Sequence, residues 1–307
     1  MKTNRIDGVI PILKPAGMTS HDVVAKLRRI IGTKRIGHTG TLDPEVTGVL
    51  PICIGKATRL SEYIMEQPKI YQGQLTLGKS TTTQDFTGQV IEEKKVKRIT
   101  ESDVQQVFQT FIGEIEQIPP MYSSVKIGGK KLYELARQGK EVDRKPRKVT
   151  IYELKIRQID LSTEFPTIDF QVKCSKGTYV RTLCVDIGIK LGYPAHMSKL
   201  VREKSGSFTI EQSFTLEQVE NYADLDQLDK IIVSMASSLP QYPSIILSEN
   251  EIIHKVFNGQ QIKVSSLIAY DGLVKVLNQK NDLVAIYQKK SQVLEAKPVK
   301  VFKEEEN

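Results

Sequence analysis

Apolar and polar residues alternate in several short segments of this chain, and the alternation predicts strands. The clearest case is residues 167–174, in which every second residue is apolar, as in a strand with one buried face. A continuous apolar run, residues 49–55, is expected to be buried backbone. Strands are predicted at residues 8–13, 69–77, 89–96, 149–159, 167–174 and 200–210.

Apolar residues three and four positions apart predict helices between these strands. In residues 19–31 they share one face, and Thr19 and Asp22 have the spacing of a capping box. Gly32 is expected to end this helix, because glycine readily takes the left-handed conformation that follows many helices. Helices are predicted at residues 19–31, 57–65, 131–138, 178–191 and 225–235, and two more are predicted to begin at Thr100 and Thr215.

A segment rich in serine and proline, residues 237–244, divides the chain. We predict a large first domain at residues 1–236, a linker at 237–244 and a small β-rich module at 245–307. Short strands are expected in this module near residues 261–264, 273–277, 283–286 and 299–302. The predicted fold class is α+β with a large mixed sheet.

The charge of the chain is concentrated in one segment. The 307 residues are 39% hydrophobic and 26% charged, as in an ordinary globular protein, and carry a net charge of +8. Residues 126–148 hold nine Lys and Arg against three acids, so they account for +6 of this excess. A concentrated basic segment favours binding to a phosphate backbone. The alternative is a solvated face of helix and loop without a ligand.

Cysteine and the N-terminal sequence indicate a cytoplasmic protein. Cys53, Cys174 and Cys184 lack metal-binding spacing and lie among apolar neighbours, so we expect buried free thiols and no metal. Unpaired cysteines suit a reducing compartment. The apolar run at residues 9–13 is too short for a signal peptide or a membrane span, so no membrane association is expected.

The strongest candidate for chemistry is Asp43, a lone acid in the glycine-rich segment 37–60. A lone carboxylate can act as a nucleophile or a base, and an arginine such as Arg181 would keep it ionised. Tyr71, on a predicted strand, could stack on a base. From the residues alone, an RNA-modifying enzyme is one interpretation. The other is an ordinary turn, in which Asp43 precedes Pro44.

Five segments, in order, resemble the motifs of the TruB family of tRNA pseudouridine-55 synthases. They include the Asp43 segment, and the others are KPAGMTSHDVV (14–24), KIYQGQLTLGKSTTTQDFTG (69–88), IPPMYSSVKIGGKKLYELAR (118–137) and CSKGTYVRTLCVDIGIKLG (174–192). Residues from Ile245 onward resemble the PUA-like RNA-binding module of such enzymes. The resemblance implies a pseudouridine synthase catalytic domain followed by this small module.

The resemblance also implies roles for individual residues. Asp43 would be the nucleophile that attacks the target uridine of tRNA, at C6 of the base or C1′ of the ribose. Tyr71 would stack on the uracil, and Arg181 would pair with Asp43. Leu200 and Tyr179 would contact the substrate in the pocket. No cofactor and no metal would be required.

The target base lies inside the folded T loop, so the resemblance implies that it is flipped out. His38 would fill the space that the base vacates, while Lys14 and Pro15 would support the catalytic loop. The partner would be the T arm of tRNA, and the protein would be a monomer. Contacts to the RNA backbone are expected from Lys126, Lys130, Lys131, Arg144 and Arg147.

Two departures from the family pattern are small. Ser124 replaces the usual alanine, and Arg202 with Glu203 replaces a more basic pair, which is expected to weaken one phosphate contact. Two alternatives stay open at this point. A non-catalytic RNA-binding or tRNA-folding protein would share the basic segment and the C-terminal module, and a synthase for another RNA would share the chemistry.

Overall fold

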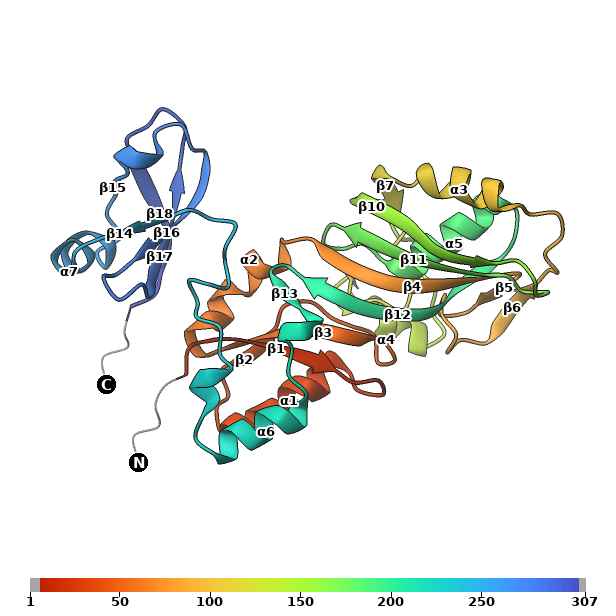
Figure 1. Ribbon diagram of the computed structural model, residues 1–307, viewed down its shortest axis with the longest axis horizontal. Helices are drawn as coiled ribbons and strands as arrows, with labels where there is room; N and C mark the ends of the chain where they lie inside the picture. The colour runs from red at the N-terminus through yellow and green to blue at the C-terminus, as the bar shows by residue number, and fades with distance from the viewer. Residues whose placement is uncertain (1–5, 304–307) are drawn as a thin grey trace.

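The computed structural model describes residues 6–303 and shows an elongated molecule with two sheets (Figure 1). The larger sheet has nine strands and lies within the first 209 residues, and a separate sheet of five strands forms the C-terminal module. The predicted α+β class with a large mixed sheet is confirmed.

The large sheet has the strand order β1-β3-β12-β4-β11-β10-β7, with β2 paired to β3 and β13 paired to β12. All neighbours are antiparallel except β12 and β3, which run parallel. Two short hairpins, β5 with β6 and β8 with β9, extend from the sheet. The strands are β1 (Gly8–Lys14), β2 (Ile36–His38), β3 (Thr47–Ile54), β4 (Lys69–Leu77), β5 (Lys79–Thr81), β6 (Val90–Glu93), β7 (Gly113–Gln117), β8 (Lys126–Ile127), β9 (Lys130–Lys131), β10 (Arg147–Asp160), β11 (Thr167–Cys174), β12 (Ala195–Ser205) and β13 (Phe208–Thr209).

Helices cover the two halves of this sheet separately. Helices α3 and α5 pack over β10, β11 and β12, whereas α1 and α6 pack beside β1 and β2 (Figure 1). The capping box predicted at Thr19 is present, and the helices predicted to begin at Thr100 and Thr215 also begin with capping boxes. Across residues 6–303, no helix is long and apolar enough to cross a membrane. The helices are α1 (Ser20–Ile31), α2 (Ser61–Met65), α3 (Glu101–Gln109), α4 (Leu132–Arg137), α5 (Val180–Leu191), α6 (Leu216–Asp224) and α7 (Glu249–Glu251).

The helix predicted at residues 225–235 is wrong. The segment forms only one 3₁₀ turn, Leu228–Lys230. Asp226 has a φ of +54°, which interrupts helical geometry soon after α6 ends. Val233 then exchanges two backbone hydrogen bonds of 2.9 Å with Val9, so pairing with β1 holds the rest of the segment extended.

The C-terminal module packs directly on the first domain. Leu277, Leu283 and Phe302 join an apolar cluster with Leu60 and other residues next to α2. Leu239, in the segment predicted as a linker, is fully buried in the same cluster. The strands of this sheet are β14 (Ser244–Ile246), β15 (Ile262–Lys263), β16 (Gly272–Leu277), β17 (Leu283–Lys289) and β18 (Glu295–Val301).

The two halves of the large sheet meet where β12 lies beside β3. Only two residue pairs form this parallel contact, Val201 with Thr47 and Arg202 with Gly48. A Cβ at Gly48 would lie 2.2 Å from the Arg202 carbonyl oxygen, and Gly48 has a φ of +110°. Both the close approach and the backbone conformation therefore require glycine here.

We expect Gly48→Ala to destabilise the fold more than backbone strain alone would. Gly113→Ala is the matched control, because Gly113 has a φ of +108° but a Cβ added there would meet no atom within 4 Å. The free energy of unfolding should fall by about 1–3 kcal/mol more for Gly48→Ala than for the control. Urea unfolding measures the difference. Equal losses would show that β3 and β12 can move apart to accommodate the Cβ without a further loss in the free energy of unfolding.

Candidate active site

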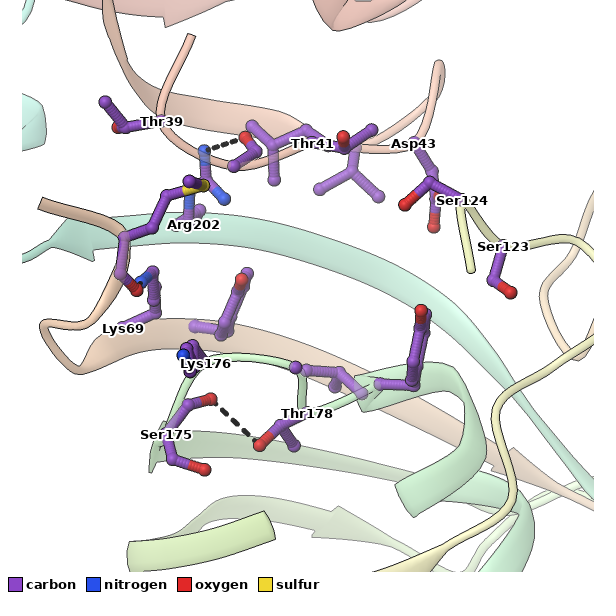
Figure 2. Close-up of a pocket in the computed structure, with 18 of the residues that line it drawn as sticks. Thr39, Thr41, Asp43, Lys69, Ser123, Ser124, Ser175, Lys176, Thr178 and Arg202 are labelled. Carbon is purple, nitrogen blue, oxygen red and sulfur yellow. Dashed lines mark hydrogen bonds between the residues drawn. The ribbon is translucent and has the colours of Figure 1, made fainter. Parts of the chain in front are cut away.

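A cavity of about 430 Å³ lies between the Asp43 loop and the strands β4 and β12. In Figure 2 the Asp43 loop lies above the cavity, the segment with Ser175 and Thr178 lies below it, and Arg202 and Lys69 lie at one end. The cavity brings together all six residues that the sequence assigned to catalysis and substrate binding. They are His38, Asp43, Tyr71, Tyr179, Arg181 and Leu200.

Lys14 fixes the loop that carries Asp43. Its side chain is fully buried, and Nζ donates hydrogen bonds of 2.8 Å to the Pro44 carbonyl and 2.5 Å to the Met18 carbonyl. Burial lowers the pKa of Lys14 to about 8. Ser20 supports the other side of the loop by accepting a 2.9 Å hydrogen bond from the Leu42 amide. The expected supporting role of Lys14 is confirmed.

Arg181, at the start of α5, holds Asp43 in place. Nε lies 3.0 Å from Oδ2 of Asp43, and Nη2 lies 3.4 Å from Oδ1. The same guanidinium donates to the Thr83 carbonyl at 3.0 Å and to the Tyr122 carbonyl at 2.8 Å. With its side chain only 6% exposed, Arg181 is oriented by three chain segments at once. A planar fork with so many acceptors has little freedom to turn away from the carboxylate.

Asp85 is a second carboxylate near Arg181, and it is not among the site residues predicted from the sequence. Its Oδ2 lies 3.6 Å from Nη1 of Arg181. Oδ1 accepts hydrogen bonds from the Thr83 hydroxyl at 2.7 Å and the Thr87 amide at 3.0 Å. The signal was present in the sequence, because Asp85 is the one acid in the threonine-rich motif TTTQDFTG.

Burial and the ion pair with Arg181 have opposite effects on the pKa of Asp43. Its side chain keeps 38% of its surface exposed, and that surface faces the cavity. Burial raises the pKa of the carboxyl, the charge of Arg181 opposes this, and the nearby Asp85 raises the pKa further. Arg181 is therefore the main group that favours the ionised form of Asp43 against its burial.

Tyr71 and Leu200 come from the neighbouring strands β4 and β12. Leu200 pairs with Gly73, and Tyr71 pairs with Arg202. Gly73 leaves room for the Leu200 side chain, since a Cβ at Gly73 would lie 3.2 Å from Leu200 Cδ1. Tyr71 and Leu200 thus form an apolar surface facing the cavity, as a stacking site for a planar ring requires.

The expectation that Arg202 belongs to an exposed phosphate contact is wrong. Arg202 is only 1% exposed. Nε donates to the Val49 carbonyl at 2.7 Å, and Nη2 donates to the Gly40 carbonyl at 3.2 Å. The side chain lies on the face of β12 that the Asp43 loop covers, and these two hydrogen bonds hold its guanidinium there. The sequence alone did not reveal this placement.

His38 and Tyr179 also line the cavity. Burial lowers the pKa of His38, and the charges of Arg202 and His21 lower it further, so the imidazole is neutral at pH 7. Tyr179 precedes α5 and is fixed by Gln117, whose side chain bonds both its amide, at 3.0 Å, and its carbonyl, at 3.2 Å.

The five basic residues predicted to contact RNA lie outside the cavity lining. Lys126, Lys130 and Arg147 are exposed. Arg144 is more constrained, because it donates to the Pro119 carbonyl at 3.2 Å and pairs with Glu141 at 3.2 Å. Lys131 is half-buried beside Tyr133. Three of the five are therefore freely available to a ligand.

A metal ion would need several ligating side chains close together. In the described part of the chain, no three His, Cys, Asp or Glu side chains are grouped to hold a metal ion. The three cysteines are free and buried, as predicted. Burial raises the pKa of Cys53 to about 12 and that of Cys174 to about 11, so these thiols stay protonated.

Comparison with known proteins gives a consistent result. Residues 28–180 match the family model "TruB family pseudouridylate synthase (N terminal domain)", and residues 181–240 match "tRNA pseudouridylate synthase B C-terminal domain". Two curated relatives named tRNA pseudouridine synthase B, from Staphylococcus aureus strains MSSA476 and JH9, are each 45% identical over 302 residues, covering 96% of this chain and 99% of the relative.

Solved structures agree at the level of the fold. A chain from a Cbf5-Nop10-Gar1 complex superposes with a TM-score of 0.74 at 28% identity, covering 96% of this chain and 84% of that one. A chain from an H/ACA RNP bound to a substrate RNA containing 2'-deoxyuridine superposes with a TM-score of 0.72 at 26% identity, covering 97% and 85%.

We expect Arg181→Met to raise the pKa of Asp43, because the cation that favours the carboxylate is removed while burial is unchanged. Carbon-13 NMR titration of the carboxyl groups measures this, with the Asp43 signal assigned from Asp43→Asn. Asp186 is the internal control, since burial raises its pKa to about 6 without help from Arg181. An unchanged Asp43 pKa would show that Arg181 does not control its ionisation.

Proposed function

Since this chain belongs to the TruB family of pseudouridine synthases, we propose that Asp43 is the nucleophile with which it isomerises uridine 55 in the T loop of tRNA. The 45% identity over 96% of the chain to relatives named tRNA pseudouridine synthase B makes it an enzyme that converts uridine in tRNA to pseudouridine. The assignment of Asp43 rests on the geometry of the cavity.

The observation that carries the proposal is the ion pair between Asp43 and Arg181 inside the cavity. Nε of Arg181 lies 3.0 Å from Oδ2 of Asp43, and the pair faces the same cavity as Tyr71. An ionised carboxylate next to a planar stacking surface provides a nucleophile and a binding surface for the base in one cavity.

Pseudouridine formation exchanges one bond of the uracil for another. The Asp43 carboxylate attacks C6 of the base or C1′ of the ribose, and the bond between N1 and C1′ breaks. The detached uracil turns while it is held against Tyr71, and C5 bonds to C1′ as the carboxylate leaves. C5 loses a proton and N1 gains one, so atoms and charge balance without an oxidant or a group donor. The cavity must therefore retain a free uracil.

Access to the target requires the nucleotide to leave the folded loop. Neutral His38 lies at the cavity and supplies a flat ring that can occupy the space left by the base. The exposed Lys126, Lys130 and Arg147 lie on segments next to the cavity wall formed by Tyr122 and Ser123, where the phosphates of the T arm would pass.

We expect Asp43→Asn to abolish the reaction while RNA binding is kept. The amide has the shape of the carboxylate but is not a nucleophile, so the rate should fall by at least about 10³-fold. The assay is tritium release from a T-arm stem-loop that carries [5-³H]uridine, because pseudouridine formation must release the hydrogen at C5. RNA binding is measured on the same stem-loop by filter retention.

Glu45→Gln is the matched control, because Glu45 is an exposed acid two residues away in the same loop. It should release tritium at the wild-type rate. Release by Asp43→Asn would contradict the proposal for the nucleophile. Binding without release by the wild-type protein would favour a non-catalytic RNA-binding or tRNA-folding protein, and release from a different RNA alone would favour another target.

We expect the triple variant Lys126→Gln, Lys130→Gln, Arg147→Gln to bind the T arm with weaker dependence on salt. Each lost phosphate contact reduces the slope of log K against log salt concentration by about 0.7–0.9, so the slope should fall by roughly 2–3. The rate at saturating RNA should stay close to that of the wild-type protein. Affinities measured between about 50 and 200 mM salt, an interval in which such slopes are resolved, provide the comparison.

The control removes three exposed charges elsewhere, with Lys94→Gln, Lys97→Gln and Lys190→Gln near the end of α5. Its salt slope should match the wild-type value. Equal reductions in both triple variants would mean that only net charge matters and that residues 126–148 form no specific contact surface.

A further inference from the structure

Arg202, at one end of the cavity, links the strands and the loop on its two sides. It lies on β12 between β3 and β4, and its backbone pairs with Gly48 on one side and Tyr71 on the other. Its side chain donates to the Val49 carbonyl at 2.7 Å and to the Gly40 carbonyl at 3.2 Å. The carbonyl of Gly40 belongs to the loop that carries Asp43, so one side chain ties β3 and that loop to the central strand.

The charge of Arg202 is not neutralised by an acid. Among residues 6–303, carboxylates pair with Arg181, but none lies within 4.0 Å of the Arg202 guanidinium. A buried cation of this kind is costly unless its hydrogen bonds are well satisfied. A methionine or leucine would fill the same space at a lower cost in free energy. The charge itself therefore requires an explanation other than packing.

The charge of Arg202 reaches Tyr71. Tyr71 is the register partner of Arg202 on the neighbouring strand, and both residues line the cavity. Burial raises the pKa of the Tyr71 hydroxyl, and the charge of Arg202 opposes this. The other titratable groups that face Tyr71 are Cys174 and Asp43, and both raise its pKa. Arg202 is thus the only one of these groups that favours the ionised hydroxyl.

We propose that Arg202 is a positioning residue for the isomerisation, which fixes the Asp43 loop through Gly40 and Val49 and orients the Tyr71 hydroxyl toward the cavity. This inference rests on the function proposed above. Arg202 lines the cavity but is only 1% exposed, and its Nε and Nη2 are bonded to backbone carbonyls, so it acts through other residues. Its hydrogen bonds set the relative position of nucleophile and stacking ring, the two parts that must face the same uracil.

The first test is a double-mutant cycle with Arg202→Met and Tyr71→Phe, measured as single-turnover tritium release at saturating RNA. In the wild-type background Arg202→Met should slow release by about tenfold to a hundredfold, with the RNA Kd changed by less than about threefold. In the Tyr71→Phe background, Arg202→Met should reduce the release rate by a smaller factor, because the hydroxyl that Arg202 orients is absent. Equal fold losses in both backgrounds, or a loss confined to Kd, would overturn the proposal.

Lys289→Met is the control for removing a buried cation. Lys289 is fully buried in the C-terminal module, and its Nζ donates to the carbonyls of Lys290, at 2.7 Å, and Val293. This variant should lose stability but release tritium at the wild-type rate per folded molecule. Thermal unfolding of both variants corrects the measured rates for the folded fraction.

A second readout does not depend on activity. The pKa of Tyr71, followed by NMR of carbon-13-labelled tyrosine and assigned from Tyr71→Phe, should rise in Arg202→Met and stay near the wild-type value in Arg202→Lys and Lys289→Met. An unchanged Tyr71 pKa in Arg202→Met would overturn the link to Tyr71. Absence of tritium release from the wild-type protein would reject the proposed function, while this titration would still decide whether Arg202 controls Tyr71.

Discussion

The structure depends on one close backbone contact, where Gly48 of β3 meets Arg202 of β12. The contact joins two half-sheets that are covered by different helices and that could otherwise fold as separate layers. Glycine is required because a Cβ would lie 2.2 Å from the Arg202 carbonyl oxygen. The Asp43 loop immediately precedes β3, and Tyr71 lies on the strand on the other side of β12. The cavity exists because these strands are held together.

Two buried arginines contact different groups around the cavity. Arg181 contacts Asp43 directly and favours the ionised carboxylate, whereas burial favours the neutral form. Arg202 has no acid partner in the described chain, donates to backbone carbonyls instead, and is the register partner of Tyr71. Since a buried charge is tolerated only when its surroundings are fixed, both arginines make the cavity rigid before the substrate arrives.

The C-terminal module contacts the segment around α2, which lines the cavity. Glu62 and Glu66 of this segment line the cavity, and they form ion pairs with Lys300 of the module and with Lys176 beside α5. Arg59, one turn earlier, stacks on Phe302 with its guanidinium carbon 5.1 Å from the ring centre. Acidic side chains at the entrance to an RNA site would repel phosphate, and these pairs reduce that repulsion. The module therefore contacts a segment that lines the cavity, while none of its own described residues lines it.

Local sequence determined most elements of this protein. The alternation in residues 167–174 and the capping boxes at Thr19, Thr100 and Thr215 act over a few residues, so they could be predicted directly. The family motifs indicated Asp43, Tyr71 and Arg181. Tertiary structure decided what depends on distant partners. These are the extended segment at Val233, which pairs with Val9, and the burial of Arg202, which depends on β12 lying between β3 and β4. No pattern along the chain encodes which strand will be central, because strand order is set by packing between residues far apart in sequence.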